Sequence, residues 1–311
     1  MSVLICGSMA YDHIMIFPDQ FKNHILPEKV HMLNVSFLVP EMRREFGGCA
    51  GNIAYNLNLL DDKIALPMAT VGKDFDPYAY WMDKRGLNRQ YITVIDDAFT
   101  GQAFITTDLD DNQITAFHPG AMNESHRNKV TDAKGTKLGI ISPDGRDGML
   151  QHAEQFAAAG IPFIFDPGQG MPMFNGDELS RFIEKATWVT VNDYEWQMMQ
   201  DKSGLTADEI LEQVDALIVT CGGDGSTIYT KEKQIKIPCV KPESITDPTG
   251  CGDAYRAGLL YGLVNDMDWE TTGRIASLLG SIKIAQHGTQ NHSFTLDEFK
   301  VKFEKEFGFN I

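Results

Sequence analysis

The sequence is poor in cysteine and lacks any long apolar run. Its five cysteines are scattered and show no C-x-x-C spacing: Cys6, Cys49, Cys221, Cys239 and Cys251. An odd, scattered set is typical of reduced thiols in the cytosol rather than of a disulfide framework. No stretch approaches the ~20 apolar residues that a membrane helix requires. We therefore expect a cytoplasmic protein with no membrane role, whose N-terminal "MSVLICGSMAYDH" forms a first strand rather than a signal peptide.

Basic residues and several familiar motifs are also scarce. Lys and Arg number 27 against 43 Asp and Glu, which gives a formal net charge of −16. This balance argues against a nucleic-acid surface and is explained by solubility. The sequence lacks G-x-x-x-x-G-K-[ST], H-E-x-x-H, G-x-S-x-G and a Cys/His cluster, and no G-x-G-x-x-G follows the first strand. These absences disfavour P-loop NTPases, zinc hydrolases, serine hydrolases and NAD enzymes.

The second half of the chain has the pattern of a parallel α/β sheet flanked by helices. Short apolar runs begin every 23 to 29 residues and alternate with helical stretches, which is the spacing of βαβ units. Such sheets bind ligands at the C-terminal ends of their strands. The expected strands are 137–142, 161–166, 187–192 and 215–221, followed by a hairpin at 225–238. The expected helices are 148–160, 176–186, 252–266, 270–288 and 295–308.

The first half mixes helices with two β-rich stretches. Helices are expected over 49–60 and near 78–85. Residues 12–46 alternate apolar and polar, and 102–119 predicts a hairpin that turns near 110–112. Neither stretch is large enough for its own core, so parts of 12–46 and 98–120 are expected to pair as a small β-sheet lid on a single domain spanning 1–311. Exposed sheet edges are often covered by a partner, which favours a homodimer through the lid.

The most informative stretch is "DPTGCGDAYRAG" at 247–258. Gly250, Cys251 and Gly252 predict a turn that opens a helix, where N–H groups and the helix dipole favour a phosphate. Asp253 would stand beside that anion, which makes no sense for binding alone. It suits a base that takes a proton from a hydroxyl attacking phosphorus. The alternative is an Asp that only caps the helix.

Two further motifs follow predicted strands. "TVNDYEW" places Asn192 and Glu195 at N-x-x-E spacing, which suits Mg²⁺ held partly through water. The same spacing is a helix capping box, and that alternative is equally good on local grounds. "TCGGDG" gives a T-x-G-x-x-G loop, Thr220 to Gly225, able to approach a nucleotide, although a tight turn is the default interpretation.

The N-terminal region offers a sugar-binding pattern. In "GGCAGN", Gly47 and Gly48 allow the backbone to approach a ligand, and Asn52 projects one turn into the helix. Asp12 follows the first strand, with Ser8 before it, and can accept hydrogen bonds from two neighbouring hydroxyls. A turn-capping Asp is the alternative.

Together "GGCAGN", "NDYE" and "DPTGCGD" resemble the signatures of the ribokinase-like, PfkB-type carbohydrate and nucleoside kinases, in the same order along the whole chain. "GSMAYDH", "LPE", "SFLVPE", "PGAM" and "TDPTGCGDAYRAG" look most like the bacterial adenosine kinases. The common family pattern has Ala where Cys251 stands, and the usual sugar-kinase pattern lacks Pro248. The resemblance implies a ribokinase-like α/β fold and Mg²⁺-ATP-dependent phosphorylation of the 5′-hydroxyl of adenosine to AMP, in purine salvage.

The resemblance also implies residue roles. Asp253 would be the catalytic base, and the N–H groups of Gly250, Cys251 and Gly252 the anion hole. Glu195 would serve Mg²⁺, and a monovalent cation (K⁺) would lie near Asp247. The substrate would contact Ser8, Asp12, Ser36, Gly48, Asn52, Phe104, Phe117 and Gln169, and ATP would contact Asn192, Thr220, Gly222, Gly223 and Gly225.

Two alternatives to an adenosine kinase stay open. A sugar kinase of the same superfamily, acting on ribose or fructose, would share the motifs, because Phe104 and Phe117 could pack in a core instead of contacting a base. A non-catalytic nucleoside-binding regulator is disfavoured by Asp253, since a binder gains nothing from that charge.

Overall fold

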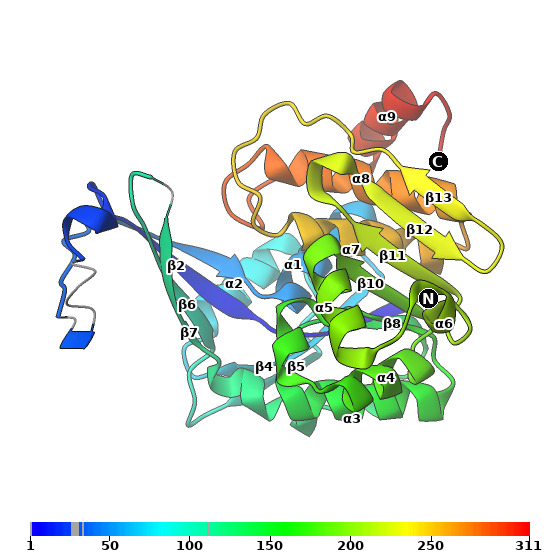
Figure 1. Ribbon diagram of the computed structural model, residues 1–311, viewed down its shortest axis with the longest axis horizontal. Helices are drawn as coiled ribbons and strands as arrows, with labels where there is room; N and C mark the ends of the chain where they lie inside the picture. Colours follow the sequence, from blue (N-terminus) through cyan, green and yellow to red (C-terminus); the bar gives the residue numbers. More distant parts are fainter. Residues whose placement is uncertain (1, 26–30, 33, 111) are drawn as a thin grey trace.

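A large sheet with helices on both faces forms the body of the molecule. The computed structural model describes residues 2–25, 31–32, 34–110 and 112–311. Within them, nine strands pair in the order β13-β12-β11-β10-β9-β8-β1-β4-β5 (Figure 1). All neighbours from β11 to β5 are parallel, and β12 and β13 form an antiparallel hairpin at the end. Their bounds are β1 Ser2–Cys6, β4 Ala65–Gly72, β5 Tyr91–Ile95, β8 Thr136–Ile141, β9 Phe163–Phe165, β10 Trp188–Asn192, β11 Ala216–Thr220, β12 Ser226–Thr230 and β13 Gln234–Ile237.

Alternate residues of the central strands enter two separate cores. In β1, Val3 and Ile5 pack with one helical layer, and Leu4 and Cys6 pack with the other. Strands buried on both faces explain why these segments are continuously apolar. The first layer contains α1 Cys49–Leu60, α7 Cys251–Val264, α8 Trp269–Ile284 and α9 Leu296–Phe307; the second contains α3 Arg146–Ala159, α4 Gly176–Lys185, α5 Asp193–Ser203 and α6 Ala207–Leu211. A third cluster lies under α2 Asp76–Arg85.

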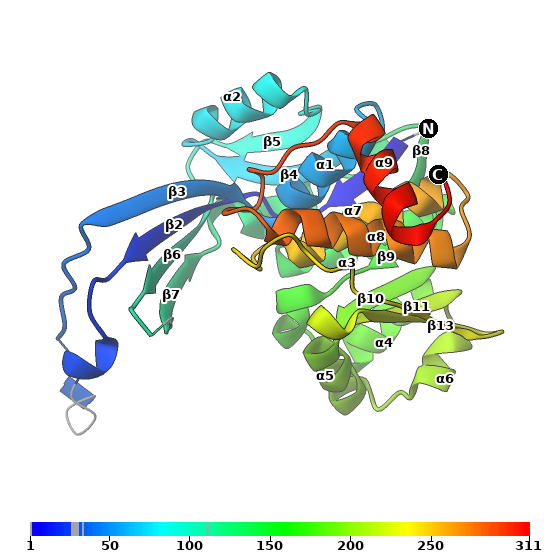
Figure 2. The ribbon, with the colours of Figure 1, turned by 90° about the horizontal axis from the view of Figure 1, so that it is seen from above.

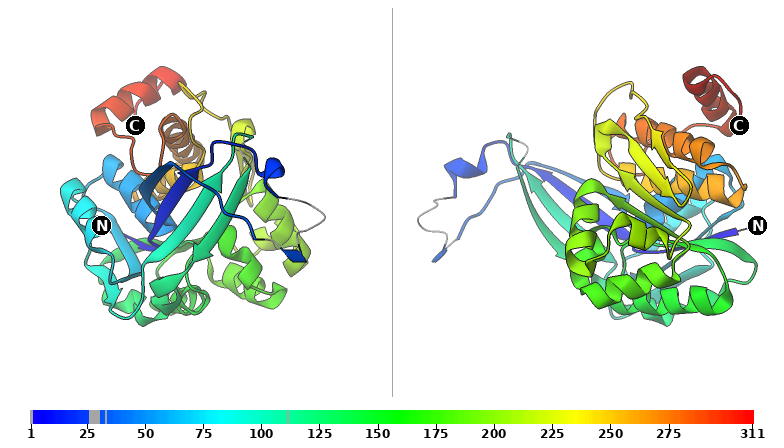
Figure 3. Two further views of the ribbon diagram at one scale, coloured as in Figure 1. Left: turned by 90° about the vertical axis from the view of Figure 1, so that its left-hand side faces the viewer. Right: turned by 45° about the vertical axis from the view of Figure 1, so that its right-hand side comes forward.

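A second, four-stranded sheet projects from one side of the body (Figures 2 and 3). It runs in the order β3-β2-β6-β7, with β2 and β6 parallel and the outer pairs antiparallel. The strands are β2 Ala10–Ile16, β3 Glu41–Gly47, β6 Gly101–Thr107 and β7 Gln113–His118. The two β-rich stretches therefore pair into one small sheet, as predicted, and we call this sheet the lid.

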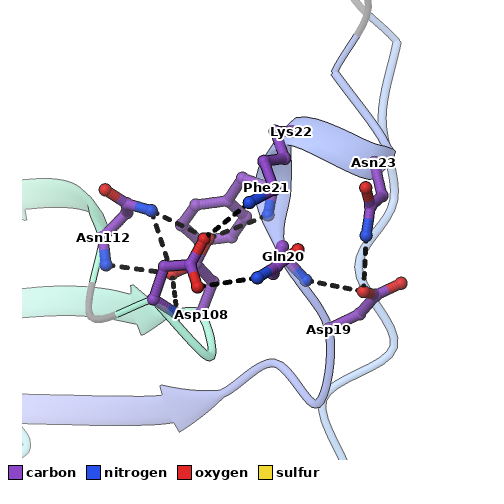
Figure 4. Close-up of polar contacts among 8 residues, drawn as sticks. Asp19, Gln20, Phe21, Lys22, Asn23, Asp108 and Asn112 are labelled. Atoms are coloured by element: carbon purple, nitrogen blue, oxygen red, sulfur yellow. Dashed lines mark hydrogen bonds and ion pairs between the residues drawn. The ribbon is translucent and has the colours of Figure 1, made fainter.

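A buried carboxylate ties the far end of the lid together (Figure 4). Asp108 is 4% exposed and accepts hydrogen bonds from the backbone N–H groups of Phe21, Asp110 and Asn112. Phe21 also stacks on Phe17. These contacts join the segment after β2 to the β6–β7 hairpin.

Most predicted elements are confirmed within a few residues. The helix at 49–60 has the predicted bounds, and α9 opens with the capping box of Thr295 and Glu298. The helix predicted to reach 288 ends at Ile284. Part of the hairpin turn near 110–112, and the "LPE" motif at 26–28, fall outside the described residues. Across the described part of the chain, none of the helices has the length and apolar character needed to cross a membrane.

Candidate active site

A cavity of about 1290 Å³ lies between the large sheet and the lid. It opens at the C-terminal ends of β8, β10 and β11, where a parallel α/β sheet binds its ligands. Loops and helix starts far apart in the sequence meet there. Of the residues singled out from the sequence, those that line it are Ser8, Asp12, Gly48, Asn52, Phe117, Gln169, Asn192, Glu195, Thr220, Gly222, Gly223, Gly225, Gly250, Cys251, Gly252 and Asp253.

The start of α7 forms a turn with free N–H groups at the floor of the cavity. Gly250 adopts φ +78°, a left-handed conformation that favours glycine, and begins the helix as its N-cap. The N–H of Cys251 is already bonded to the carbonyl of Pro248. Within the described residues, the N–H groups of Gly250, Gly252 and Asp253 have no acceptor in the protein. The free N–H groups are thus those of Gly250, Gly252 and Asp253, whereas the N–H of Cys251, which the sequence placed in the same set, closes the turn.

Asp253 is not a helix cap. It is the third residue of α7, and its Oδ2 accepts a hydrogen bond from the side-chain Nδ2 of Asn52 at 2.8 Å. Desolvation raises the pKa of Asp253 to about 7, and the Asn52 hydrogen bond opposes this rise. A carboxylate with a pKa near neutrality, next to free N–H groups, is well matched to accepting a proton at physiological pH.

A chain of amide groups fixes the orientation of Asn52. The side chain of Gln290 donates to Asn52 Oδ1 at 3.0 Å and contacts the Tyr78 hydroxyl at 2.6 Å. Trp81 in turn donates to Gln290 Oε1. Because Asn52 Oδ1 is occupied as an acceptor, its Nδ2 must face Asp253. The network therefore presents a donor to the carboxylate.

A buried ion pair supports the helix that carries Asp253. Arg256, one turn further along α7, forms two hydrogen bonds with Asp166, at 3.0 and 3.1 Å, and both side chains are buried. The Glu195 carboxylate lies 4.0 Å from Arg256. Asp166 follows β9, so the pair ties the start of α7 to the centre of the large sheet.

Asn192 and Glu195 form a helix capping box, which was the alternative to a Mg²⁺ site in the sequence. Asn192 Oδ1 accepts from the N–H of Glu195 at 2.7 Å, and Glu195 Oε2 accepts from the N–H of Asn192 at 2.8 Å. Both residues still line the cavity, and Glu195 keeps Oε1 outside the capping box. In the described ranges no three His, Cys, Asp or Glu side chains gather closely enough to hold a metal. A divalent cation would therefore need phosphate and water ligands in addition to Glu195.

One face of the lid covers the cavity. Asp12 pairs with Ala103 across β2 and β6, and Ala103 pairs with Phe117 across β6 and β7. Paired residues point to the same face, so Asp12 and Phe117 lie in one row. Desolvation raises the pKa of Asp12 to about 6, and Glu45 and Asp247 add to the rise.

Phe104 and Ser36 depart from expectation. Phe104 precedes Ile105 on β6 and follows Ala103, both of which line the cavity, so it points to the opposite face. There it stacks on His13, with ring centroids 4.8 Å apart. Ser36 is exposed in the segment before β3 and does not line the cavity. The structure therefore does not bring Phe104 or Ser36 to the other site residues.

Comparison with known proteins gives a consistent result. Residues 7–295 match the model of the pfkB family of carbohydrate kinases. The chain is 54% identical to a nucleoside kinase from Burkholderia thailandensis solved in complex with inosine, with a TM-score of 0.90 and 99% of both chains covered. A nucleoside kinase from Methanocaldococcus jannaschii is 34% identical over 89% of this chain and 92% of its own length. A Thermotoga maritima ribokinase, 21% identical with a TM-score of 0.80 over 98% of this chain and 99% of its own, shares the fold.

The chain belongs to the pfkB family of carbohydrate kinases. It is a phosphotransferase that acts on a hydroxyl group. The fold is the ribokinase-like α/β fold with a separate small sheet.

In this kinase, Ser8 and Gly48 shape the part of the cavity next to the lid. The Ser8 hydroxyl accepts from the N–H of Cys49, the first residue of α1, at 3.1 Å. Gly48 has φ +86°, and a Cβ there would lie 2.5 Å from the Met9 backbone. Any larger residue would push α1 away from the loop after β1, so Gly48 has a packing role whatever it binds.

Four residues that support this kinase site were not singled out from the sequence, and two of them, Asp166 and Arg256, also line the cavity. Arg256, Asp166, Gln290 and Lys283 are all buried and charged or polar. Arg256 lies within "DAYRAG", and Lys283 interrupts the apolar run "LLGSIKIA". Both are therefore charged residues within the apolar pattern of a helix, which could have been recognised in the sequence. A charged residue within an apolar helix pattern predicts a buried partner. Gln290 carried no comparable signal.

Proposed function

We propose that this kinase transfers the γ-phosphoryl group of ATP to the 5′-hydroxyl of purine nucleosides, adenosine among them. The observation that carries the proposal is one cavity that joins Asp12 and Phe117 of the lid to Asp253 and the free N–H groups of α7. The named nucleoside kinases support it, and the Burkholderia thailandensis enzyme has also been solved with ADP-inosine, at 55% identity and a TM-score of 0.88 over 99% of this chain and 97% of its own.

The arrangement at α7 suits phosphoryl transfer. Asp253 takes the proton of the 5′-hydroxyl as its oxygen attacks the γ-phosphorus, and the bond to the bridging oxygen of ADP breaks. The N–H groups of Gly250, Gly252 and Asp253 stabilise the charge on the transferring group, with the positive end of the α7 dipole behind them. The base and the anion site thus lie at one helix end.

The acceptor would bind on the lid side. Asp12, half-buried and with its pKa raised to about 6, accepts hydrogen bonds from ribose hydroxyls. Gly48 and Asn52 complete the ribose contacts, and Ser8 holds the loop that presents them. Phe117 stacks on the base, and Gln169, exposed at the cavity wall, contacts its polar edge.

ATP would bind along the opposite wall. Thr220 ends β11 and Asn192 ends β10, and the loop after β11 contains Gly222, Gly223 and Gly225. Mg²⁺, when bound with ATP, would neutralise charge on the phosphates. Glu195, which lines the cavity, would be its protein ligand. The whole chain, residues 1–311, would act as one kinase domain whose lid excludes water, a competing acceptor, from the cavity.

A phosphoryl-transfer assay with Mg²⁺-ATP tests the proposal. Its acceptors are adenosine, inosine, a pyrimidine nucleoside, ribose and fructose, and the readouts are kcat/KM and the position of the phosphate in the product. We expect the purine nucleosides to lead, with phosphate on the 5′-oxygen. Turnover of ribose or fructose without turnover of nucleosides would overturn it in favour of a sugar kinase. Calorimetric binding of nucleoside without transfer would indicate a binding protein.

A further inference from the structure

Lys283, on the last turn of α8, is the one lysine among the described residues that is completely buried. Its Nζ donates to the backbone carbonyl of Asp247 at 2.7 Å and to that of Gln286 at 3.3 Å. Burial of an ammonium group costs several kcal/mol unless it is paired and hydrogen-bonded. An apolar side chain would fill the space at no such cost, so the charge itself calls for a function.

The ammonium contacts the segment that leads into the turn with the free N–H groups. Asp247 begins the stretch that leads to Gly250, and its carboxylate accepts from the N–H groups of Thr249 at 2.9 Å and Gly288 at 2.9 Å. Lys283 therefore bonds the backbone of Asp247. The side chain of Asp247 in turn holds Thr249, just before the turn, and Gly288, in the loop after α8. Removal of Lys283 would release the carbonyl that anchors this stretch.

The charge of Lys283 also reaches the anion site. Burial raises the pKa of Cys251 to about 11, and the field of Lys283 opposes that rise. Desolvation lowers the pKa of Lys283, and the charges of Asp247, Cys251 and Asp253 oppose that shift. A positive charge fixed behind the start of α7 adds to the helix dipole and stabilises negative charge in front of it.

The oxygen atoms around Lys283 are those that an alkali ion would need. Hard cations bind carbonyl and carboxylate oxygens. The carbonyls of Asp247 and Gln286 already accept hydrogen bonds from Lys283 Nζ. Both oxygens of the Asp247 carboxylate accept hydrogen bonds from backbone N–H groups. The expectation of K⁺ near Asp247 therefore does not fit the residues present, because a side-chain cation occupies the position.

We propose that the Lys283 ammonium is a built-in replacement for a monovalent cation, which positions the Gly250 turn and makes phosphoryl transfer independent of K⁺. Lys283 is not among the residues that line the cavity, so its role would be that of a positioning residue. The proposal depends on the kinase reaction and not on which acceptor is used. Its assays therefore take whichever acceptor the substrate panel shows to be turned over fastest.

The first measurement uses the unaltered enzyme. kcat and KM for ATP are determined in tetramethylammonium buffer and then with KCl up to 100 mM at constant ionic strength. We expect less than a twofold change in kcat. Activation of fivefold or more by K⁺, saturating with concentration, would overturn the proposal without reference to any variant.

The second measurement uses Lys283→Met, which keeps most of the side-chain volume and removes the charge. We expect kcat to fall about tenfold or more in tetramethylammonium buffer, and to be restored in part by K⁺ or NH₄⁺. Lys137→Met is the matched control, since Lys137 also bonds a carbonyl (Val264, 2.8 Å) and a carboxylate (Asp266, 2.7 Å), but at the far end of α7. Its kcat should stay within twofold.

The outcomes separate a cation replacement from a merely structural lysine. A folded Lys283→Met enzyme with unchanged kcat, or with a loss that neither K⁺ nor NH₄⁺ relieves, would overturn the proposal. Lys283→Arg retains charge and donors, and we expect it to lose less activity than Lys283→Met and to gain nothing from K⁺. If Lys283→Met fails to fold, the potassium titration of the unaltered enzyme and of Lys283→Arg still decides.

Discussion

Asn52 and Asp253 are 201 positions apart in the sequence, yet the amide of Asn52 donates to the carboxylate of Asp253 at 2.8 Å. The contact joins the start of α1 to the start of α7, and so ties together two parts of the cavity wall. It also favours the charged form of a carboxylate that desolvation disfavours. The two effects together leave the pKa of this carboxylate near neutrality.

Replacement of Asp253 by Asn should remove the base and leave the cavity intact. We expect kcat to fall by about 10²–10⁴-fold, with KM for acceptor and ATP changed by less than about fivefold. Steady-state kinetics with the best acceptor, on protein whose thermal unfolding is normal, measures this. Near-normal turnover would remove Asp253 from the role of base.

The pH dependence of kcat/KM should follow the same carboxylate. Its pKa of about 7 means that the base is protonated and inactive at lower pH. The rate should therefore rise with pH, about tenfold per unit below pH 7, and level off above pH 8. Asn52→Ala removes a hydrogen bond that favours the charged form, so the inflection should move to higher pH. A profile that is flat from pH 5.5 to 8 would contradict this account.

Phe117 and Phe104 lie on opposite faces of the lid, so one can serve as the control for the other. Phe117 lines the cavity, while Phe104 stacks on His13 on the opposite face. Stacking of a base on an aromatic ring contributes about 1–3 kcal/mol. Phe117→Ala should thus raise KM for a nucleoside about tenfold or more, and Phe104→Ala should change it less than twofold. Equal effects of the two substitutions would show that the lid binds the acceptor differently.

The sequence was sufficient to predict features that depend on residues close together in the chain. The turn that opens a helix at 250–252, the capping-box alternative at Asn192 and the hairpin at 225–238 depend on neighbouring residues, and the structure contains each of them. The strand β4 was missed because Pro67 stands inside it and interrupts a strand pattern. The strand β5 is half-exposed at the sheet edge and gives little apolar signal.

Features that depend on register or on distant partners could not be predicted. The face to which Phe104 points is set by the pairing of β6 with β2 and β7, and a shift by one residue would reverse it. The partner of Arg256 lies 90 positions away in Asp166. The capping interpretation of Asp253 failed because α7 already begins at Cys251, which makes Asp253 its third residue, and its Oδ2 accepts instead from Asn52 in another part of the chain.

The buried pair of Arg256 and Asp166 should dominate the stability of the site. Both side chains are buried, and removal of one partner leaves an uncompensated charge. Arg256→Met should therefore lower the free energy of unfolding by about 3–5 kcal/mol. Lys302→Met is the control, because Lys302 pairs with Glu243 at 3.0 Å but both are exposed, and its effect should stay within about 1 kcal/mol.

Denaturant unfolding of both variants measures this difference, and the double variant Arg256→Met/Asp166→Leu gives a further check. If the cost of the single change comes from the stranded carboxylate, removal of that carboxylate should recover much of the lost stability. Activity should not return with it, because α7 loses its attachment to the end of β9 and Asp253 loses its fixed position. Recovery of full turnover in the double variant would show that the ion pair serves stability alone.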